Sequence, residues 1–200
     1  MKNSKIPFVT YLFFILVYAN QGLVSLPSQC IYYLTRETWG LSATMLGLIA
    51  FITQFAWYVK PVFGILTDYY GIRNYRSKYY LRINYIILLS LGLYVIIFGL
   101  NLISLIIIAF LTNIAIAFND VCNDTQMVIL EQKYNLKGKI QALQWISLGT
   151  TGLFVSIFGA YIAAKFPEPL NYKIAHGIYL LLPLLTLIYL FYFYQEEPIK

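Results

Sequence analysis

Long apolar stretches alternate with short polar stretches along the whole chain. The apolar stretches predict helices at about 6–34, 42–68, 80–100, 103–131, 139–164 and 174–194. A helix of about 20 mostly apolar residues crosses a hydrocarbon core of roughly 30 Å. The stretches are too long for barrel strands and lack their alternation of polar and apolar residues. We therefore expect an all-α, polytopic membrane protein in which residues 1–200 form one bundle of six transmembrane helices.

The composition excludes an ordinary soluble domain. Hydrophobic residues make up 60% of the chain, charged residues make up 11%, and the mean hydropathy is +0.70. Soluble domains carry about 25% charged residues. The composition therefore supports the prediction of a membrane protein.

The basic residues are unevenly distributed between the predicted loops. If the loops alternate between the two sides of a membrane, one side carries only Arg36, Lys165 and Lys173. The other side carries Lys2, Lys5, Arg73, Arg76, Lys78, Arg82, Lys133, Lys137, Lys139 and Lys200. Because lysine and arginine are enriched in cytoplasmic loops, we expect both termini in the cytoplasm, in a membrane that the sequence does not identify. The net charge of +6 then reflects topology and attraction to lipid headgroups, so no nucleic-acid partner is expected.

The sequence carries no recognisable enzyme signature. It contains no P-loop, no H-E-x-x-H, no G-x-S-x-G and no C-x-x-C motif. His176 has no second ligand beside it, so we expect an interfacial polar residue there and no metal site. We therefore expect a protein that is not an enzyme, with no catalytic residues and no cofactor.

Three charged residues lie at membrane depth, away from the ends of the predicted helices: Lys60, Asp120 and Asp124. Each costs about 2.5–3.5 kcal/mol at a helix centre unless it gains a partner or a wet cavity. Lys60 lies eight residues before Asp68, and the two aspartates lie eleven and seven residues before Glu131. At about 1.5 Å per residue from the helix ends, the three charges lie at similar depths. We expect them to meet.

The two aspartates share one helical face because they are four residues apart. Asn113 lies seven residues before Asp120 and joins the same face. Such a polar stripe indicates a wall that faces a cavity. Two uses remain open at this point, a proton-coupled switch and a static structural ion pair.

Several groups of residues carry a resemblance to known transporters. Gly64, Asp68, Gly71 and Arg73 have the spacing of the loop motif between the second and third helices of the major facilitator superfamily. The chain resembles more closely the folate-biopterin transporter family within that superfamily. This similarity begins in the second helix and the loop after it, at Trp57, Lys60, Pro61, Gly64, Thr67, Asp68, Tyr75, Arg76, Lys78 and Tyr80. It continues in the fourth helix and at the start of the fifth, at Ala117, Phe118, Asp120, Asp124, Gly138, Gln141 and Trp145. The resemblance covers most of the chain, and Gly71, Asn74 and Leu148 depart from the folate-biopterin pattern.

The resemblance implies a secondary-active transporter of a folate-like or pterin-like solute, coupled to protons and working by alternating access. It implies that the chain is the N-terminal six-helix half of such a fold. The implied substrate and proton pathway consists of Lys60, Asp120, Asp124, Asn20, Gln21, Gln141 and Gln144. A loop that latches one conformational state is implied at Gly64, Asp68, Gly71, Arg73, Arg76 and Lys78, and a purely topological role for its basic residues is the alternative.

A second six-helix half is the expected partner. Transporters of this superfamily place the solute between two such halves, near the middle of the membrane. We expect the second half in a longer chain or in a partner subunit, because one half alone would expose its buried charges to lipid. The competing hypotheses are a non-transporting membrane protein, either a degenerate remnant or an assembly module, and a transporter of a different small organic solute. The buried lysine and aspartates favour transport, because a scaffold would be more stable with apolar residues there.

Overall fold

Helices make up most of the part of the chain that the structure describes. The computed structural model describes residues 8–136 and 138–198, so Lys2, Lys5, Lys137 and Lys200, which we used to predict the orientation, lie outside the described residues. In chain order the elements are α1 (Phe8–Leu23), α2 (Ser28–Tyr33), the π-helical turn η1 (Leu34–Thr38), α3 (Ala43–Tyr58), α4 (Lys60–Tyr69), α5 (Lys78–Phe98), α6 (Leu102–Tyr134), α7 (Lys139–Lys165) and α8 (Leu170–Tyr192).

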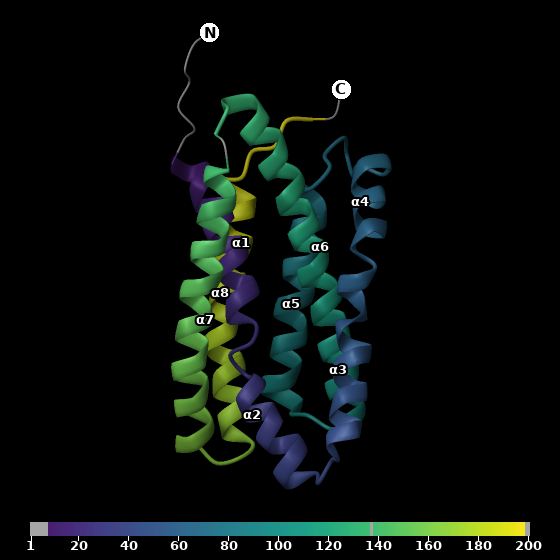
Figure 1. Ribbon diagram of the computed structural model, residues 1–200, viewed down its shortest axis with the longest axis vertical. Coiled ribbons are helices and arrows are strands. Elements are labelled where there is room, and N and C mark those ends of the chain that lie inside the picture. The colour runs from purple at the N-terminus through teal and green to yellow at the C-terminus, as the bar shows by residue number, and fades with distance from the viewer. Residues whose placement is uncertain (1–7, 137, 199–200) are drawn as a thin grey trace.

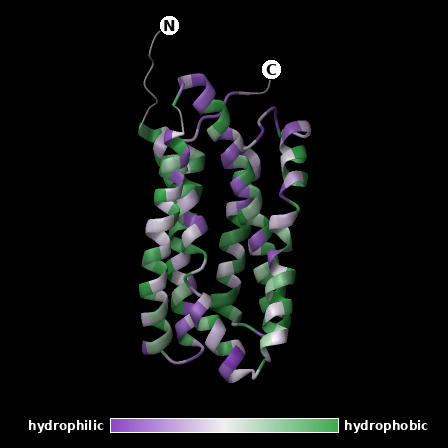
Figure 2. Cartoon of the chain, viewed as in Figure 1, coloured by the Kyte–Doolittle hydropathy of each residue, from purple (hydrophilic) through white to green (hydrophobic). Residues whose placement is uncertain are grey.

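Six helical stretches in the described part of the chain are long and apolar enough to cross a membrane. The first combines α1, α2 and η1, the second combines α3 and α4, and α5 to α8 form one stretch each. Figure 2 shows apolar residues along the length of these helices and polar residues concentrated towards the two ends of the bundle. The predicted fold class is therefore confirmed, and the chain is an integral, multi-pass membrane protein.

The helices run up and down between two ends of the bundle. The start of α1 and the end of α8 lie at the same end, together with the α4–α5 and α6–α7 connections (Figure 1). We call this the terminal end. Helix α1 packs against α7 and α8, α5 packs against α6 and α8, and both α3 and α4 pack against α6. The contact between α5 and α8 therefore joins the two sides of the bundle.

Two of the six stretches are interrupted, although the sequence pattern predicted continuous helices at 6–34 and 42–68. The first helix stops at Leu23 and resumes at Ser28, directly after Pro27. The second is interrupted at Val59, directly before α4, whose first turn contains Pro61. Proline has no N–H to donate and its ring crowds the carbonyl four residues earlier, so both interruptions follow from the sequence. Figure 1 shows that both lie away from the ends of the bundle.

Glycine allows α1 to approach α7 closely. A Cβ atom on Gly22 would lie 2.0 Å from Thr151 Oγ1 and 3.2 Å from the carbonyl oxygen of Leu148. The Thr151 hydroxyl is held in place because it donates to the carbonyls of Ser147 and Leu148 at 2.8 and 3.0 Å. A side chain at residue 22 would therefore press on a group that cannot turn away without losing these bonds.

The segment after α8 caps the start of α5. The carboxylate of Glu196 accepts hydrogen bonds from the backbone N–H groups of Arg76, Ser77 and Lys78 at 2.9, 3.0 and 2.7 Å, and from Gln126 Nε2 at 3.1 Å. Ser77 is the N-cap residue, but its hydroxyl donates to the carbonyl of Cys122 and does not cap its own helix. Burial raises the pKa of the Glu196 carboxyl, and these backbone N–H groups oppose that rise. A residue distant in sequence therefore supplies the cap of this helix.

We predict that Gly22→Ala destabilises the protein, because the added methyl group overpacks the contact between α1 and α7. The expected cost is about 1–3 kcal/mol, visible as a lower midpoint of thermal unfolding of the purified protein in detergent. Gly149→Ala on α7 is the matched control, because its Cβ would meet no atom within 4 Å. Equal midpoints for the two variants would contradict the predicted close approach.

We predict that Glu196→Ala loosens the start of α5. Losing charge-assisted hydrogen bonds should speed amide exchange at Arg76, Ser77 and Lys78 by about tenfold to a hundredfold, measured by hydrogen–deuterium exchange with mass spectrometry. Gln195→Ala, at an exposed neighbour, should leave these amides unchanged. Unaltered protection in the Glu196→Ala protein would show that another group caps the helix.

Candidate functional site

The interruption of the second helix places Lys60 at the start of α4. Lys60 is the first residue of α4, and Val59 before it has φ −93° and ψ 9°, outside the helical region. Helix α4 is held against α6 by the rings of Phe63 and Phe118, whose centroids lie 5.0 Å apart. The bend therefore directs the Lys60 side chain towards α6.

Lys60 forms an ion pair with Asp120 of α6. Its Nζ donates a hydrogen bond to Asp120 Oδ2. The Asp120 side chain is 7% exposed and the Lys60 side chain is 28% exposed, so the pair is largely removed from water. Breaking such a pair by removing one partner typically costs about 3–5 kcal/mol, because the other charge is left buried and alone. The two residues are therefore energetically dependent on each other.

The second carboxylate, Asp124, has a different partner. Tyr18 of α1 donates its hydroxyl hydrogen to Asp124 Oδ1 at 3.2 Å. Asp124 lies one helical turn after Asp120 on α6, so the two carboxylates are neighbours on one face. This contact joins α1 to α6 through a phenol and a carboxylate. The sequence analysis did not identify Tyr18, because nothing in its local pattern distinguishes it from an interfacial tyrosine.

Trp57 connects the ion pair to Asn113, which lies seven residues before Asp120 on α6. The Lys60 Nζ atom is 5.2 Å from the centre of the Trp57 ring, which is within the range of a cation–π contact. The indole N–H of Trp57 donates to Asn113 Oδ1 at 2.9 Å, and Asn113 Nδ2 donates to the carbonyl of Ala109 at 2.9 Å. The stripe predicted on α6 therefore makes contacts at three levels, through Asn113, Asp120 and Asp124.

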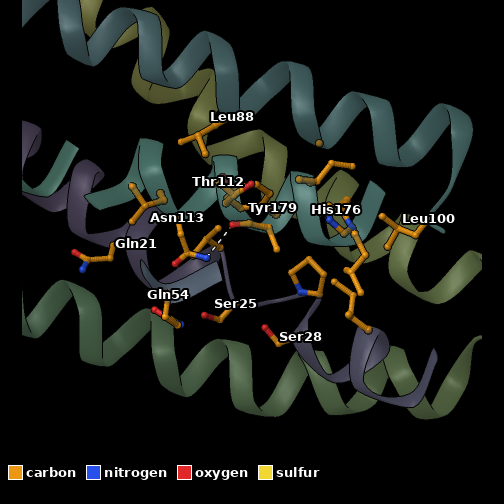
Figure 3. Close-up of a pocket in the computed structure, with 18 of the residues that line it drawn as sticks. Gln21, Ser25, Ser28, Gln54, Leu88, Leu100, Thr112, Asn113, His176 and Tyr179 are labelled. Atoms are coloured by element: carbon orange, nitrogen blue, oxygen red, sulfur yellow. Dashed lines mark hydrogen bonds between the residues drawn. The ribbon is translucent and has the colours of Figure 1, made fainter. Parts of the chain in front are cut away.

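A cavity of about 400 Å³ opens beside this stripe, where Thr112 and Asn113 of α6 line it. It reaches the interruption of the first helix and is lined by α3, α5, α6, α7 and α8 as well. Its polar lining consists of Gln21, Ser25, Ser28, Gln54, Trp57, Thr112, Asn113, His176 and Tyr179, most of which are labelled in Figure 3. Trp57 and Asn113 line the cavity, and Trp57 also contacts Lys60, so the ion pair lies next to the cavity although neither Lys60 nor Asp120 lines it.

The predicted uncharged pathway residues are dispersed. Gln21 lines the cavity, as expected for a solute contact. Asn20 is fully buried and donates to Thr186 Oγ1 and to the carbonyl of Leu16, both at 2.7 Å, so it joins α1 to α8. Gln141 is exposed on α7, and Gln144 is buried but lines no part of the cavity. The structure therefore brings Gln21 to the site and leaves Asn20, Gln141 and Gln144 outside it.

The predicted latch loop is only partly joined by ion pairs. Arg76 Nη1 lies 3.3 Å from Asp68 Oδ1. The other two cations contact tyrosine rings, because Lys78 Nζ lies 4.9 Å from the centre of the Tyr75 ring and the Arg73 guanidinium lies 5.5 Å from that of Tyr79.

Gly64, the first glycine of the latch, has no close contact that requires glycine. It lies within α4 with open space around its Cβ position, and Gly71 lies in the connection between α4 and α5. Of the latch residues, all of which are described, Asp68 and Arg76 alone form a salt bridge with each other.

His176 corrects an expectation from the sequence. It is buried and lines the cavity, whereas its position near a helix end predicted an interfacial residue. Its Nδ1 lies 2.7 Å from the carbonyl of Tyr172. Within residues 8–136 and 138–198, no three His, Cys, Asp or Glu side chains gather closely enough to hold a metal ion.

The chain is similar in sequence to several proteins that are named as transporters. It is 23% identical over 172 residues to the folate-biopterin transporter of Synechocystis sp., a match covering 85% of this chain and 34% of the relative. It is 27% identical to the probable folate-biopterin transporter 4 of Arabidopsis thaliana, over 73% of this chain and 31% of the relative. It is 27% identical to folate transporter 2 of Plasmodium falciparum, over 76% of this chain and 34% of the relative.

The chain spans about a third of the length of these curated relatives. No solved structure matches it. The profile of the BT1 family matches residues 21–199, and the chain therefore belongs to the BT1 family.

Proposed function

We propose that this chain forms one half of a secondary-active membrane transporter for a folate-like solute. The observation that carries the proposal is the buried pair of Lys60 and Asp120 at a helix interruption, joined by the Trp57 ring to a polar cavity. Interrupted helices that line a cavity are the usual sites for solutes and coupling ions in secondary transporters. The names of the relatives supply the solute class.

Lys60 is the residue that we propose to bind the negative end of the solute. Folates carry carboxylates, and an ammonium removed from water has a strong electrostatic attraction for one. In the state described, Asp120 occupies that position. A solute carboxylate that replaces Asp120 would release it, so solute binding would change the charge balance within the helix bundle.

Asp124 is the residue that we propose to exchange protons. It lies one turn from the ion pair and accepts a hydrogen bond from Tyr18. At this separation the charge of Asp120 acts on the Asp124 carboxylate, and it acts more strongly when Lys60 does not neutralise it. Two neighbouring carboxylates repel each other when both are ionised, and freeing Asp120 therefore favours protonation of one of them. This arrangement couples a proton to the solute carboxylate without a further charged group.

Alternating access requires a second body that moves against this one. We propose a second six-helix half, in a longer chain or in a partner subunit, since the relatives are about three times as long as the region that they share with this chain. We further propose that the Asp68–Arg76 ion pair holds one of the two states and that both termini face the cytoplasm. The concentration of basic residues at the terminal end supports this orientation.

A double-mutant cycle tests the role of the ion pair. Lys60→Ala and Asp120→Asn should each nearly abolish uptake of labelled folate by the full-length protein in a host that lacks folate uptake. The double variant should lose little more, which corresponds to a coupling energy of about 0.5–3 kcal/mol. Lys165→Ala, at the exposed end of α7, is the control and should transport normally. Simple additivity, at equal amounts of protein in the membrane, would argue against the coupling.

The pH dependence of uptake tests the role of Asp124. Asp124→Asn should flatten the dependence of folate uptake on external pH, because the variant side chain cannot exchange a proton. Tyr18→Phe keeps the carboxylate and removes only its hydrogen-bond donor, so this control should still show a pH-dependent rate. An Asp124→Asn profile that follows the wild-type curve would exclude this residue as the proton carrier.

A further inference from the structure

The cavity has a second polar centre that the proposed pathway does not use. His176 and Tyr179 are three residues apart on α8, so they face the cavity from the same side of that helix. In Figure 3, Gln21 and Asn113 lie towards one end of the cavity and His176 and Leu100 towards the other, with Tyr179 between them. These two residues therefore belong to the part of the cavity that is distant from Lys60.

Tyr179 has a hydroxyl group that lacks a partner. The residue is 4% exposed, and its hydroxyl makes no hydrogen bond with any described residue. A buried polar atom without a partner typically costs about 1–3 kcal/mol. Tyr179 also lines the cavity, so a ligand that turns the Tyr179 ring towards the cavity satisfies the hydroxyl and recovers this energy.

His176 offers an acceptor next to this hydroxyl. A backbone carbonyl can only accept, so the short contact with Tyr172 requires that His176 Nδ1 carries the hydrogen. In the neutral ring Nε2 is then an acceptor, and no described residue donates to it. The two side chains together present a fixed acceptor and a hydroxyl that can donate or accept.

The surrounding walls exclude a charged ligand group. Leu100 lies beside His176 in Figure 3, Leu88, Leu105 and Ile108 also line the cavity, and no Lys, Arg, Asp or Glu side chain lines any of it in the described chain. A carboxylate placed here would lose its hydration without gaining a cation. A flat, uncharged heterocycle with N–H groups and ring acceptors fits both the apolar walls and the two polar side chains.

We propose that His176 and Tyr179 bind the nitrogen heterocycle of the solute, with a ring N–H group donating to His176 Nε2. The proposal rests on the transport function proposed above and deepens it by giving the solute an orientation. The pteridine ring of a folate lies at the α8 end, and its carboxylates point past Trp57 to Lys60. Asp120 lies seven residues beyond Asn113 on α6, about 10 Å along the helix, so the two ends of the site suit an elongated molecule.

Binding of solute fragments to the full-length protein tests this orientation. The probes are biopterin, which has the ring without the glutamate, and p-aminobenzoylglutamate, which has the glutamate without the ring. Their dissociation constants would be measured by calorimetry on protein in lipid nanodiscs. Tyr179→Phe should weaken biopterin binding about three- to tenfold, the effect of one hydrogen bond, and leave p-aminobenzoylglutamate binding unchanged. His176→Phe should have the same selective effect.

A matched control separates the site from a general effect of losing a buried hydroxyl. The hydroxyl of Tyr85 is also buried without a partner among the described residues, but Tyr85 does not line the cavity. Tyr85→Phe should leave the binding of both probes unchanged. Neither tyrosine variant should lower the unfolding midpoint, because neither substitution removes a hydrogen bond.

The possible failures are distinguishable. If the wild-type protein binds neither probe nor folate, the proposed function fails and the ring assignment fails with it. If the wild-type protein binds the probes but Tyr179→Phe and His176→Phe bind biopterin normally, the transport proposal stands and the ring assignment is overturned. If Tyr179→Phe weakened the binding of both probes equally, the ring assignment would also be overturned, because the hydroxyl would then not bind the ring selectively.

Discussion

The ion pair between Lys60 and Asp120 is the constraint around which this bundle is organised. Each charge is stable away from water only while the other is present, so α4 and α6 must keep a fixed relation or be supplied with a substitute partner. Pro61 makes the pair possible because it interrupts the second helix directly beside Lys60. A continuous helix at this position would present the lysine on a regular helical face, without the bend that directs it towards Asp120.

The same interruption joins the charges to the cavity. Trp57, in the last turn of α3, contacts Lys60 with its ring face and Asn113 with its N–H group. The interruption of the first helix borders the cavity from the opposite side, through Ser25 and Ser28. Two helices that are not continuous therefore line one site, and each is interrupted beside a proline, which cannot donate a helical hydrogen bond.

The sequence predicted the features that depend on local spacing. The six apolar stretches follow from length and hydropathy, and counting residues from the helix ends placed Lys60 beside Asp120 because helical rise is regular. The features that it missed depend on which face of each helix meets a neighbour. Gln141 and Gln144 resemble pathway residues by type, but the orientation of α7 leaves one exposed and the other outside the cavity. Pro27 was a visible signal of the first interruption, whereas the capping of α5 by Glu196 joins residues that no sequence pattern relates.

In the mechanism that we propose, the position of Trp57 links solute binding in the cavity to the charge of Lys60. A solute that lies in the cavity must pass the indole to reach Lys60, so it has to alter the Trp57–Asn113 hydrogen bond, the cation–π contact, or both. Either change acts on Lys60 at the hinge-like junction of α3 and α4, where the backbone already departs from helical geometry. Displacing Lys60 from Asp120 leaves a buried carboxylate next to Asp124, and the resulting repulsion favours uptake of a proton. In the mechanism that we propose, the aromatic ring is the link between solute and proton, because Trp57 both lines the cavity and contacts the ammonium group.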